Sequence, residues 1–193
     1  MPRETATILV AGTGGGVGTT TIAALLFESL STDRSPVLLD HTDGDLGRRL
    51  PSGSDVGVVD ESLELHDLGA HATGPLLERL ARPLTFAVVA APTTPAGFAA
   101  IRRLLTDVRD RHGAAGLAHT VVAAVGAFGS HPTRKASESL QNDFGWGSLV
   151  VIPRDPALAA GGRVPLGRLS RDTRRAQRQL ARLVGERLGS RAL

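Results

Sequence analysis

Short runs of apolar and β-branched residues recur along this chain, separated by stretches in which apolar positions have helical spacing. Continuous runs of about four to eight such residues predict buried strands. The predicted strands cover residues 7–11, 36–40, 63–67, 84–91, 120–125 and 149–153. Because buried strands that alternate with helices are typical of parallel sheets, we expect an α/β fold. Its central sheet should be mostly parallel, with helices on both faces.

Between the predicted strands, apolar residues recur every three or four positions, which predicts helices packed against the sheet. These helices cover residues 22–30, 74–82, 97–112, 133–142 and 172–188. Residues 51–62 are rich in Pro, Gly, Ser and Asp, so we expect a loop there. No repeat or linker divides the chain. Residues 1–193 are therefore expected to form a single domain with a sizeable core.

Composition narrows the class of protein. The chain has no cysteine, which excludes disulfides and thiolate metal sites. No apolar run approaches the length of a transmembrane helix, and the first apolar run is too short for a secretory signal. We therefore expect a soluble, cytoplasmic protein.

Positive charge gathers at the end of the chain. Residues 163–193 contain nine arginines against Asp172 and Glu186, a net charge of +7, whereas the whole chain carries +3. A solvated face on a core-packing helix is the structural interpretation of these arginines. The functional interpretation is binding of non-specific nucleic acid, with an anionic membrane surface as a further alternative. The candidate polyanion-binding residues are Arg171, Arg174, Arg175, Arg178 and Arg182.

Five glycines lie between residues 12 and 18, after the first predicted strand and before the first helix. This layout is typical of a phosphate-binding loop, because glycine N–H groups can curl around an oxyanion at a helix N-terminus. The usual pattern, G-x-x-x-x-G-K-[ST], has lysine where this chain has Thr19. The nucleotide-binding candidates here are Gly14, Gly15, Gly16, Val17, Gly18, Thr19, Thr20 and Thr21.

The loop resembles the deviant Walker A motif of the ParA/MinD family of partitioning ATPases, K-G-G-x-G-K-T-T. Gly14 stands at the signature lysine of that pattern and Thr19 at its second lysine, while the glycines and threonines match. The resemblance includes a proline turn at Pro92 and an I-P-x-D segment at residues 152–155. It covers about residues 5–188 and implies a P-loop NTPase-like fold that binds ATP and Mg²⁺.

In the resembled family, the strand after the first helix ends in D-x-D, near Mg²⁺ and the attacking water. Asp40 matches the first of these carboxylates, and the second falls on Thr42, with Asp43 beside it. The resemblance thus implies Asp40 and Asp43 as catalytic candidates, because a carboxylate there can orient water. It implies Thr20, Asp40 and Asp67 as candidate Mg²⁺ ligands.

Two further segments match the family. Asp67 and Gly69 stand where a Walker B aspartate and a γ-phosphate-sensing glycine are expected, and Pro153 and Asp155 match a loop beside the base. His41, His66 and His71 lie near these carboxylates and raise the alternative of a different metal site. No H-x-x-x-H spacing supports that alternative, so polar loop histidines are the preferred interpretation.

The resemblance implies a partitioning or positioning protein that forms a homodimer or binds a partner in a positioning or secretion system. Because both lysines and the second aspartate are replaced, charges that stabilise the transition state are missing. We therefore expect weak or absent ATP hydrolysis and a nucleotide-responsive or pseudo-ATPase scaffold. One alternative is an active ATPase completed by a partner or dimer. Another is a Rossmann-type oxidoreductase, with Asp40 on the ribose, although the chain lacks the tyrosine of short-chain dehydrogenases.

Overall fold

The computed structural model describes residues 4–31, 35–52, 58–72, 74–126, 133–144 and 148–189. Its strands are β1 (Ala6–Gly12), β2 (Ser35–Asp40), β3 (Val59–Asp67), β4 (Thr85–Pro92), β5 (Thr120–Val125) and β6 (Leu149–Ile152). Its α-helices are α1 (Thr19–Leu30), α2 (Asp45–Arg49), α3 (Pro75–Arg79), α4 (Pro95–Ala118), α5 (Thr133–Phe144), α6 (Pro156–Ala159) and α7 (Arg171–Gly189).

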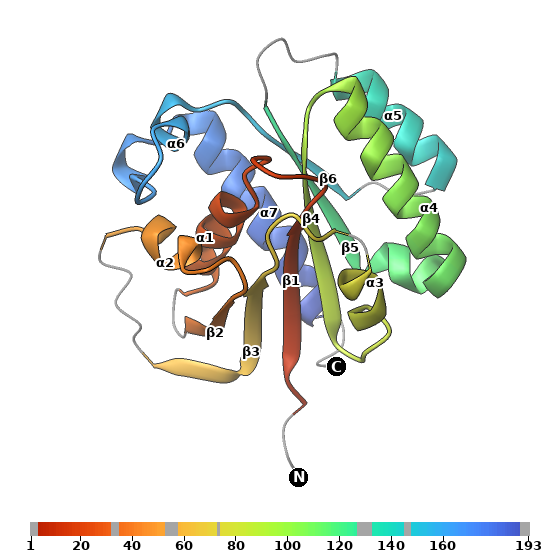
Figure 1. Ribbon diagram of the computed structural model, residues 1–193, viewed down its shortest axis with the longest axis horizontal. Coiled ribbons are helices and arrows are strands. Elements are labelled where there is room, and N and C mark those ends of the chain that lie inside the picture. Colours follow the sequence, from red (N-terminus) through yellow and green to blue (C-terminus); the bar gives the residue numbers. More distant parts are fainter. Residues whose placement is uncertain are drawn as a thin grey trace.

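The six strands form one parallel sheet in the order β2-β3-β1-β4-β5-β6 (Figure 1). Parallel neighbours need crossover connections, which is why helices separate the strands. This arrangement confirms the predicted α/β fold. It also brings the carboxyl ends of all the strands to one edge of the sheet, where ligands bind in open α/β folds.

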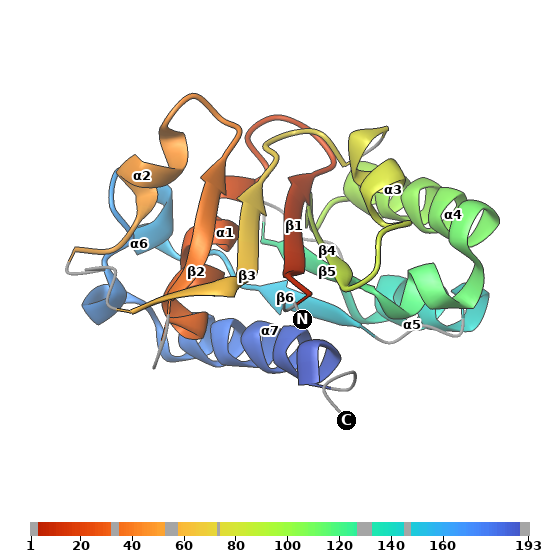
Figure 2. The ribbon, with the colours of Figure 1, turned by 90° about the horizontal axis from the view of Figure 1, so that it is seen from below.

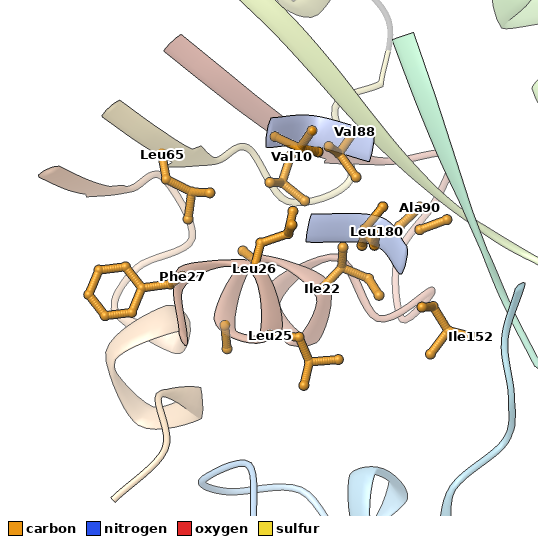
Figure 3. Close-up of a cluster of buried hydrophobic side chains, with 14 of the residues drawn as sticks. Val10, Ile22, Leu25, Leu26, Phe27, Leu65, Val88, Ala90, Ile152 and Leu180 are labelled. Carbon is orange, nitrogen blue, oxygen red and sulfur yellow. The ribbon is translucent and has the colours of Figure 1, made fainter. Parts of the chain in front are cut away.

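Helices cover both faces of the sheet (Figures 1 and 2). Ile8 and Val10 of β1 pack with α1 and α7, whereas Leu9 and Ala11 pack with α3, α4 and α5. All four side chains are fully buried, because successive residues of a strand face opposite sides. Figure 3 shows the first of these clusters, in which side chains from α1, three central strands, β6 and α7 meet.

α7 is fixed to the body of the protein by polar contacts as well as by its apolar face. Gln177 Nε2 donates to the carbonyl oxygen of Leu25 at 3.1 Å. Arg187 donates to the carbonyl oxygen of Ala118 at 2.7 Å and to the hydroxyl of Ser148. None of the helices described here is long and apolar enough to cross a membrane.

The two largest differences from the predicted boundaries lie in β3 and α4. Strand β3 begins at Val59, so the last part of the loop predicted at residues 51–62 is strand. The first residues of β3 lie at a register shift opposite β2. There Ser62 N and Oγ donate to Asp60 Oδ1, so these positions are polar and do not show the apolar pattern of a buried strand. Helix α4 continues to Ala118 across a kink at Gly113, which has a φ of 63°.

Candidate functional site

The glycine loop connects β1 to α1 at the carboxyl edge of the sheet, held by the ends of two neighbouring strands. Gly12 N donates to the carbonyl oxygen of Gly69 at 2.6 Å, and Thr13 N donates to that of Ala90 at 2.9 Å. A Cβ on Gly12 would collide with Oγ1 of Thr19 and lie 2.7 Å from Cγ2 of Val17. The loop can therefore fold back onto β1 only because residue 12 is glycine.

The N-terminus of α1 has no side-chain cap, so its positive end is not neutralised by the helix's own residues. Gly18 is its N-cap, with a left-handed φ of 90°, and no side chain caps the helix. The first turn contains no acidic residue. Since the first N–H groups of a helix have no intrahelical partner, they can bind an anion in front of α1.

Asp67 ends β3 next to this loop and is completely buried. Its Oδ1 accepts a hydrogen bond of 3.0 Å from Gly69 N, whereas its Oδ2 has no hydrogen-bond partner in the described part of the chain. Burial raises the pKa of Asp67, although the contacts with Gly69 and with the Thr20 hydroxyl oppose the rise. A buried carboxylate oxygen without a partner is poised to bind a cation.

Asp40 ends β2 and pairs in register with Asp67, so the two predicted carboxylates lie on adjacent strand ends. Asp40 accepts hydrogen bonds from Thr42 N, Thr42 Oγ1 and Leu46 N at 2.7, 2.5 and 3.1 Å. Burial alone would raise its pKa, but these hydrogen bonds lower it. Asp43 is exposed, with a left-handed φ of 56°. Asp40 therefore orders the turn into α2, where it already has partners.

The candidate Mg²⁺ ligands fit that ion's chemistry. Mg²⁺ is usually held by one or two carboxylates, by water and by the phosphates of a ligand, rather than by a protein cage. Thr20 and Asp67 meet at the loop, with Asp40 on the neighbouring strand. Two of the histidines do contact each other, with His41 Nε2 3.1 Å from His66 Nδ1. However, no group of three His, Asp or Glu side chains that could hold a metal ion occurs among the described residues, so the histidine alternative gains no support.

A cavity of about 250 Å³ opens beside the loop. It lies between the start of α1 and the segments that follow β5 and β6. Its lining residues are Gly16, Val17, Gly18, Thr21, Ile22, Val125, Gly126, Ile152, Pro153, Arg154, Asp155, Leu158 and Ala159. The structure thus brings four of the predicted loop residues, Gly16, Val17, Gly18 and Thr21, together with Pro153 and Asp155. In the resembled family an asparagine near the end of the fifth strand commonly contacts the adenine, and the nearest residues here, Ala127 and Ser130, lie outside the described residues.

Asp155 has a structural role in the wall of this cavity. It is the N-cap of α6, where Oδ1 accepts from Ala157 N at 3.0 Å, and Oδ2 accepts from Ser170 N at 2.9 Å. Burial opposes ionisation, but hydrogen bonds from Ser170, Thr173 and Ala157 prevail and lower the pKa of Asp155. The Asp-Pro pair at residues 155–156 is a helix-start signal that could have revealed α6 in the sequence.

Replacing Asp155 with alanine should lower the free energy of unfolding by about 1–2 kcal/mol at neutral pH, as for a lost N-cap. Because the pKa of Asp155 is lowered on folding, its contribution is present above its unfolded pKa and is lost as pH falls through the folded value. Urea unfolding of wild type and Asp155→Ala should therefore differ most near pH 7 and converge in strong acid. A difference that stays constant with pH would contradict this prediction.

The candidate arginines form one stripe on α7. Arg171, Arg174, Arg175, Arg178 and Arg182 follow helical spacing and are all exposed. The opposite side of the helix carries the buried residues Thr173, Ala176, Leu180 and Val184. The arginine stripe therefore faces solvent along its whole length, while the apolar stripe of α7 packs in the hydrophobic core.

Sequence reasoning missed one cation near the loop. Arg49, at the end of α2, donates from Nε to Oγ1 of Thr21 at 2.9 Å. Arg49 is 28 positions away from Thr21 in the sequence and reaches the loop through the fold. The short helix α2 was not predicted, so no sequence signal indicated this contact.

No protein-family model matches the sequence. No curated protein has a significant sequence match to it. Solved structures, in contrast, resemble the fold over nearly its whole length. The MinC:MinD cell division protein complex of Aquifex aeolicus matches with a TM-score of 0.64 and 14% identity, over 94% of this chain and 96% of that one.

Two further structures extend this comparison. A ParA family ATPase from Chlorobium tepidum matches with a TM-score of 0.58 and 15% identity, over 95% of this chain and 98% of that one. A variant of McdA from Cyanothece in complex with ATP matches with a TM-score of 0.58 and 16% identity, over 95% and 98%. The chain therefore has the P-loop NTPase-like fold of the ParA and MinD ATPases.

Proposed function

We propose that this protein is a ParA/MinD-like positioning or partitioning protein that binds ATP and Mg²⁺ at the glycine loop. Its ATP hydrolysis is weak or absent, so it acts as a nucleotide-responsive scaffold. The observation that carries this proposal is the buried, unpartnered Oδ2 of Asp67 beside Thr20. A native protein rarely leaves such a group unsatisfied unless a ligand, an ion or water completes it.

Weak hydrolysis is inferred from the charges around the loop. Glycine and threonine occupy the two lysine positions, and the only lysine of the chain, Lys135, lies in α5. α5 packs beside α4, on the face of the sheet opposite α1. The loop can hold phosphate with backbone N–H groups, but it lacks the side-chain cations that stabilise a phosphoryl-transfer transition state.

The strand order argues against the dinucleotide alternative. In a Rossmann fold, the acidic residue for the ribose follows the strand adjacent to β1. Here β3 lies between β1 and β2, so Asp40 is two strands away from the loop. Adjacent strands lie roughly 4.8 Å apart, which places Asp40 about 10 Å from the end of β1. Its carboxylate is also already hydrogen-bonded within its own turn.

The same comparison supports a proposal about partners. One similar structure is a MinC:MinD complex, and another is McdA bound to ATP. We propose by analogy that this chain forms a homodimer or binds a protein partner in a positioning or secretion system. A partner that supplies an arginine would turn the scaffold into an active ATPase, which is the alternative that the missing lysines leave open.

Calorimetric titration with ATP, ADP and NAD in the presence of Mg²⁺ tests the proposal, together with a turnover assay on the same samples. We expect weak binding of ATP and ADP, no binding of NAD and little phosphate release. Thr20→Ala should remove the Mg²⁺ dependence of the binding. Turnover equal to that of lysine-bearing ATPases would contradict the scaffold role, and binding of NAD alone would favour the Rossmann alternative.

A second candidate function rests on the arginine stripe of α7. The exposed guanidinium groups at i, i+3, i+4, i+7 and i+11 can neutralise successive phosphates of a nucleic acid. Insertion into a membrane is disfavoured, because the apolar stripe of α7 is buried against α1 and the sheet. We therefore propose non-specific nucleic acid binding along this face.

Replacing Arg174 and Arg178 with glutamine should weaken DNA binding and lower the slope of log K against log salt by about 2, since each arginine should neutralise about one phosphate. The matched control is the same change at Arg103 and Arg111, which are exposed on α4. Equal effects of the two pairs in fluorescence anisotropy would show that overall charge, not the stripe, governs binding. Preference for anionic vesicles over DNA would favour the membrane alternative.

A further inference from the structure

Arg49 lies directly behind two walls of the cavity beside the loop. Its Nε donates to Thr21 Oγ1 at 2.9 Å, and its two terminal nitrogens donate to the carbonyl oxygens of Gly162, at 2.7 Å, and Leu158. Thr21 and Leu158 both line the cavity. The guanidinium therefore links the start of α1, on the side of the glycine loop, to the segment that follows β6.

This cation has no counter-ion among the described residues. Its partners there are one hydroxyl and two carbonyl oxygens, and burial lowers the pKa of Arg49. A partly buried charge without an opposite charge favours an anion nearby. The N-terminus of α1 adds positive polarity at the same place. Arg49 and the N-terminus of α1 thus add positive potential on the loop side of the cavity, whose lining also includes Arg154 and the carboxylate of Asp155.

Thr21 connects this cation to the cavity. Its Oγ1 accepts a hydrogen bond from Arg49, so its own hydrogen is left to donate elsewhere. Within the described chain that hydrogen has no protein acceptor, and the residue faces the cavity. A hydroxyl that accepts from a guanidinium is a stronger donor, because hydrogen bonds in a chain polarise one another.

We propose that Arg49 acts through Thr21 as the cationic positioning residue for the phosphate groups of a nucleotide at the loop. This inference rests on the proposed nucleotide binding and adds a source of positive charge behind the loop. Arg49 compensates in part for the lysines absent at residues 14 and 19. It raises affinity for phosphate-bearing ligands specifically, because its charge acts on the phosphates and not on the base.

A purely structural role makes a different prediction. If Arg49 only ties α1 to the segment that contains Leu158 and Gly162, its loss should deform the cavity wall and weaken every ligand alike. The dependence of affinity on the number of phosphates therefore separates the two roles. The chain provides a matched control in Arg48, which is adjacent, exposed and paired with Asp45 at 3.1 Å.

The test is calorimetric titration of the full chain with ATP, ADP, AMP and adenosine, each with Mg²⁺. We expect Arg49→Gln to lower affinity for ATP and ADP about tenfold, as for one charge-assisted hydrogen bond, and to leave adenosine unchanged. Arg48→Gln should change neither. Thr21→Val should reproduce the loss, Thr21→Ser should not, and the double variant should lose no more than Arg49→Gln alone.

The outcomes separate this inference from the proposed function. If wild type binds no nucleotide, the proposed function fails and this inference falls with it. If wild type binds ATP and Arg49→Gln binds it equally well, or weakens adenosine to the same extent, the inference alone is wrong. Should Arg49→Gln fail to fold in a thermal unfolding assay, Thr21→Val decides the question: unchanged affinity for ATP in that variant overturns the inference.

Discussion

Replacing Thr19 with lysine is expected to tighten ATP binding by about ten- to a hundred-fold. A lysine at this position of a P-loop reaches the β- and γ-phosphates. It would add a charge-assisted hydrogen bond, worth about 1.5–3 kcal/mol, to those that backbone N–H groups supply. Every 1.4 kcal/mol corresponds to about tenfold in affinity, which sets the range.

The fold should tolerate lysine at residue 19, because the glycine side of the loop is not crowded by other atoms. A Cβ built on Gly14, Gly15 or Gly16 would have no neighbouring atom within 4 Å, so the space around these three glycines is open. Thr19 itself is buried, with its hydroxyl beside Gly12. Only the first carbons of the new side chain need to occupy that buried space.

Calorimetry with ATP measures the gain, and Thr19→Met is the matched control, because methionine has a stem of similar length without the charge. Gly14→Lys should change ATP affinity only if the protein dimerises, since the signature lysine acts across the interface in the resembled family. Sedimentation of the single and double variants detects that dimer. A gain for Thr19→Met equal to that for Thr19→Lys, or no gain for lysine in a folded variant, would show that the loop does not present phosphate to residue 19.

The layers of the fold could be predicted from the sequence because the period of apolar residues dictates them. The run at residues 120–125 is continuous and apolar, and the structure places a strand at Thr120–Val125. β3 was predicted only in part, since its first half lies at a register shift and buries few apolar groups. The helices α2 and α6 were missed because about one turn is too short to show a period.

The candidate site was only partly predictable for a different reason. Residues that are adjacent in sequence, such as those of the glycine loop, are recognised by their spacing. Contacts that depend on the strand order are not: Asp40 and Asp67 meet because β2 pairs with β3, and Arg49 reaches Thr21 across 28 positions. The role of Asp155 as a helix cap, in contrast, follows from the Asp-Pro pair and was open to sequence reasoning.

Replacing Asp67 with asparagine should have opposite effects with and without Mg²⁺-nucleotide. Burial raises the pKa of Asp67, so the folded state binds its proton more tightly than the unfolded state does. Wild-type stability therefore falls as pH rises from the unfolded pKa towards the folded one, and the penalty persists above it. Asparagine carries no charge, so the variant should be more stable than wild type at neutral pH in the absence of ligands.

Mg²⁺-ATP should reverse this order. If Oδ2 of Asp67 binds the ion, Mg²⁺-ATP stabilises wild type by mass action. In the Asp67→Asn variant, the affinity for Mg²⁺-ATP should fall about a hundred-fold, because the Mg²⁺-dependent part is lost. Asp40→Asn, on the adjacent strand end, is the comparison for the pH dependence without ligand only, because Asp40 is itself a candidate Mg²⁺ ligand. Hydrogen bonds lower the pKa of Asp40, so its contribution to stability is present at neutral pH, and the neutral variant should be less stable than wild type there.

Urea unfolding at several pH values, with EDTA or with Mg²⁺-ATP, measures all of these differences in one experiment. With EDTA, we expect the Asp67→Asn variant to exceed wild type in stability at pH 7 and to approach it in strong acid, where wild-type Asp67 is protonated. With Mg²⁺-ATP, only wild type should gain. If Asp67→Asn is less stable than wild type with EDTA, or if Mg²⁺-ATP stabilises both proteins equally, the buried oxygen of Asp67 is satisfied in some other way and does not bind the ion.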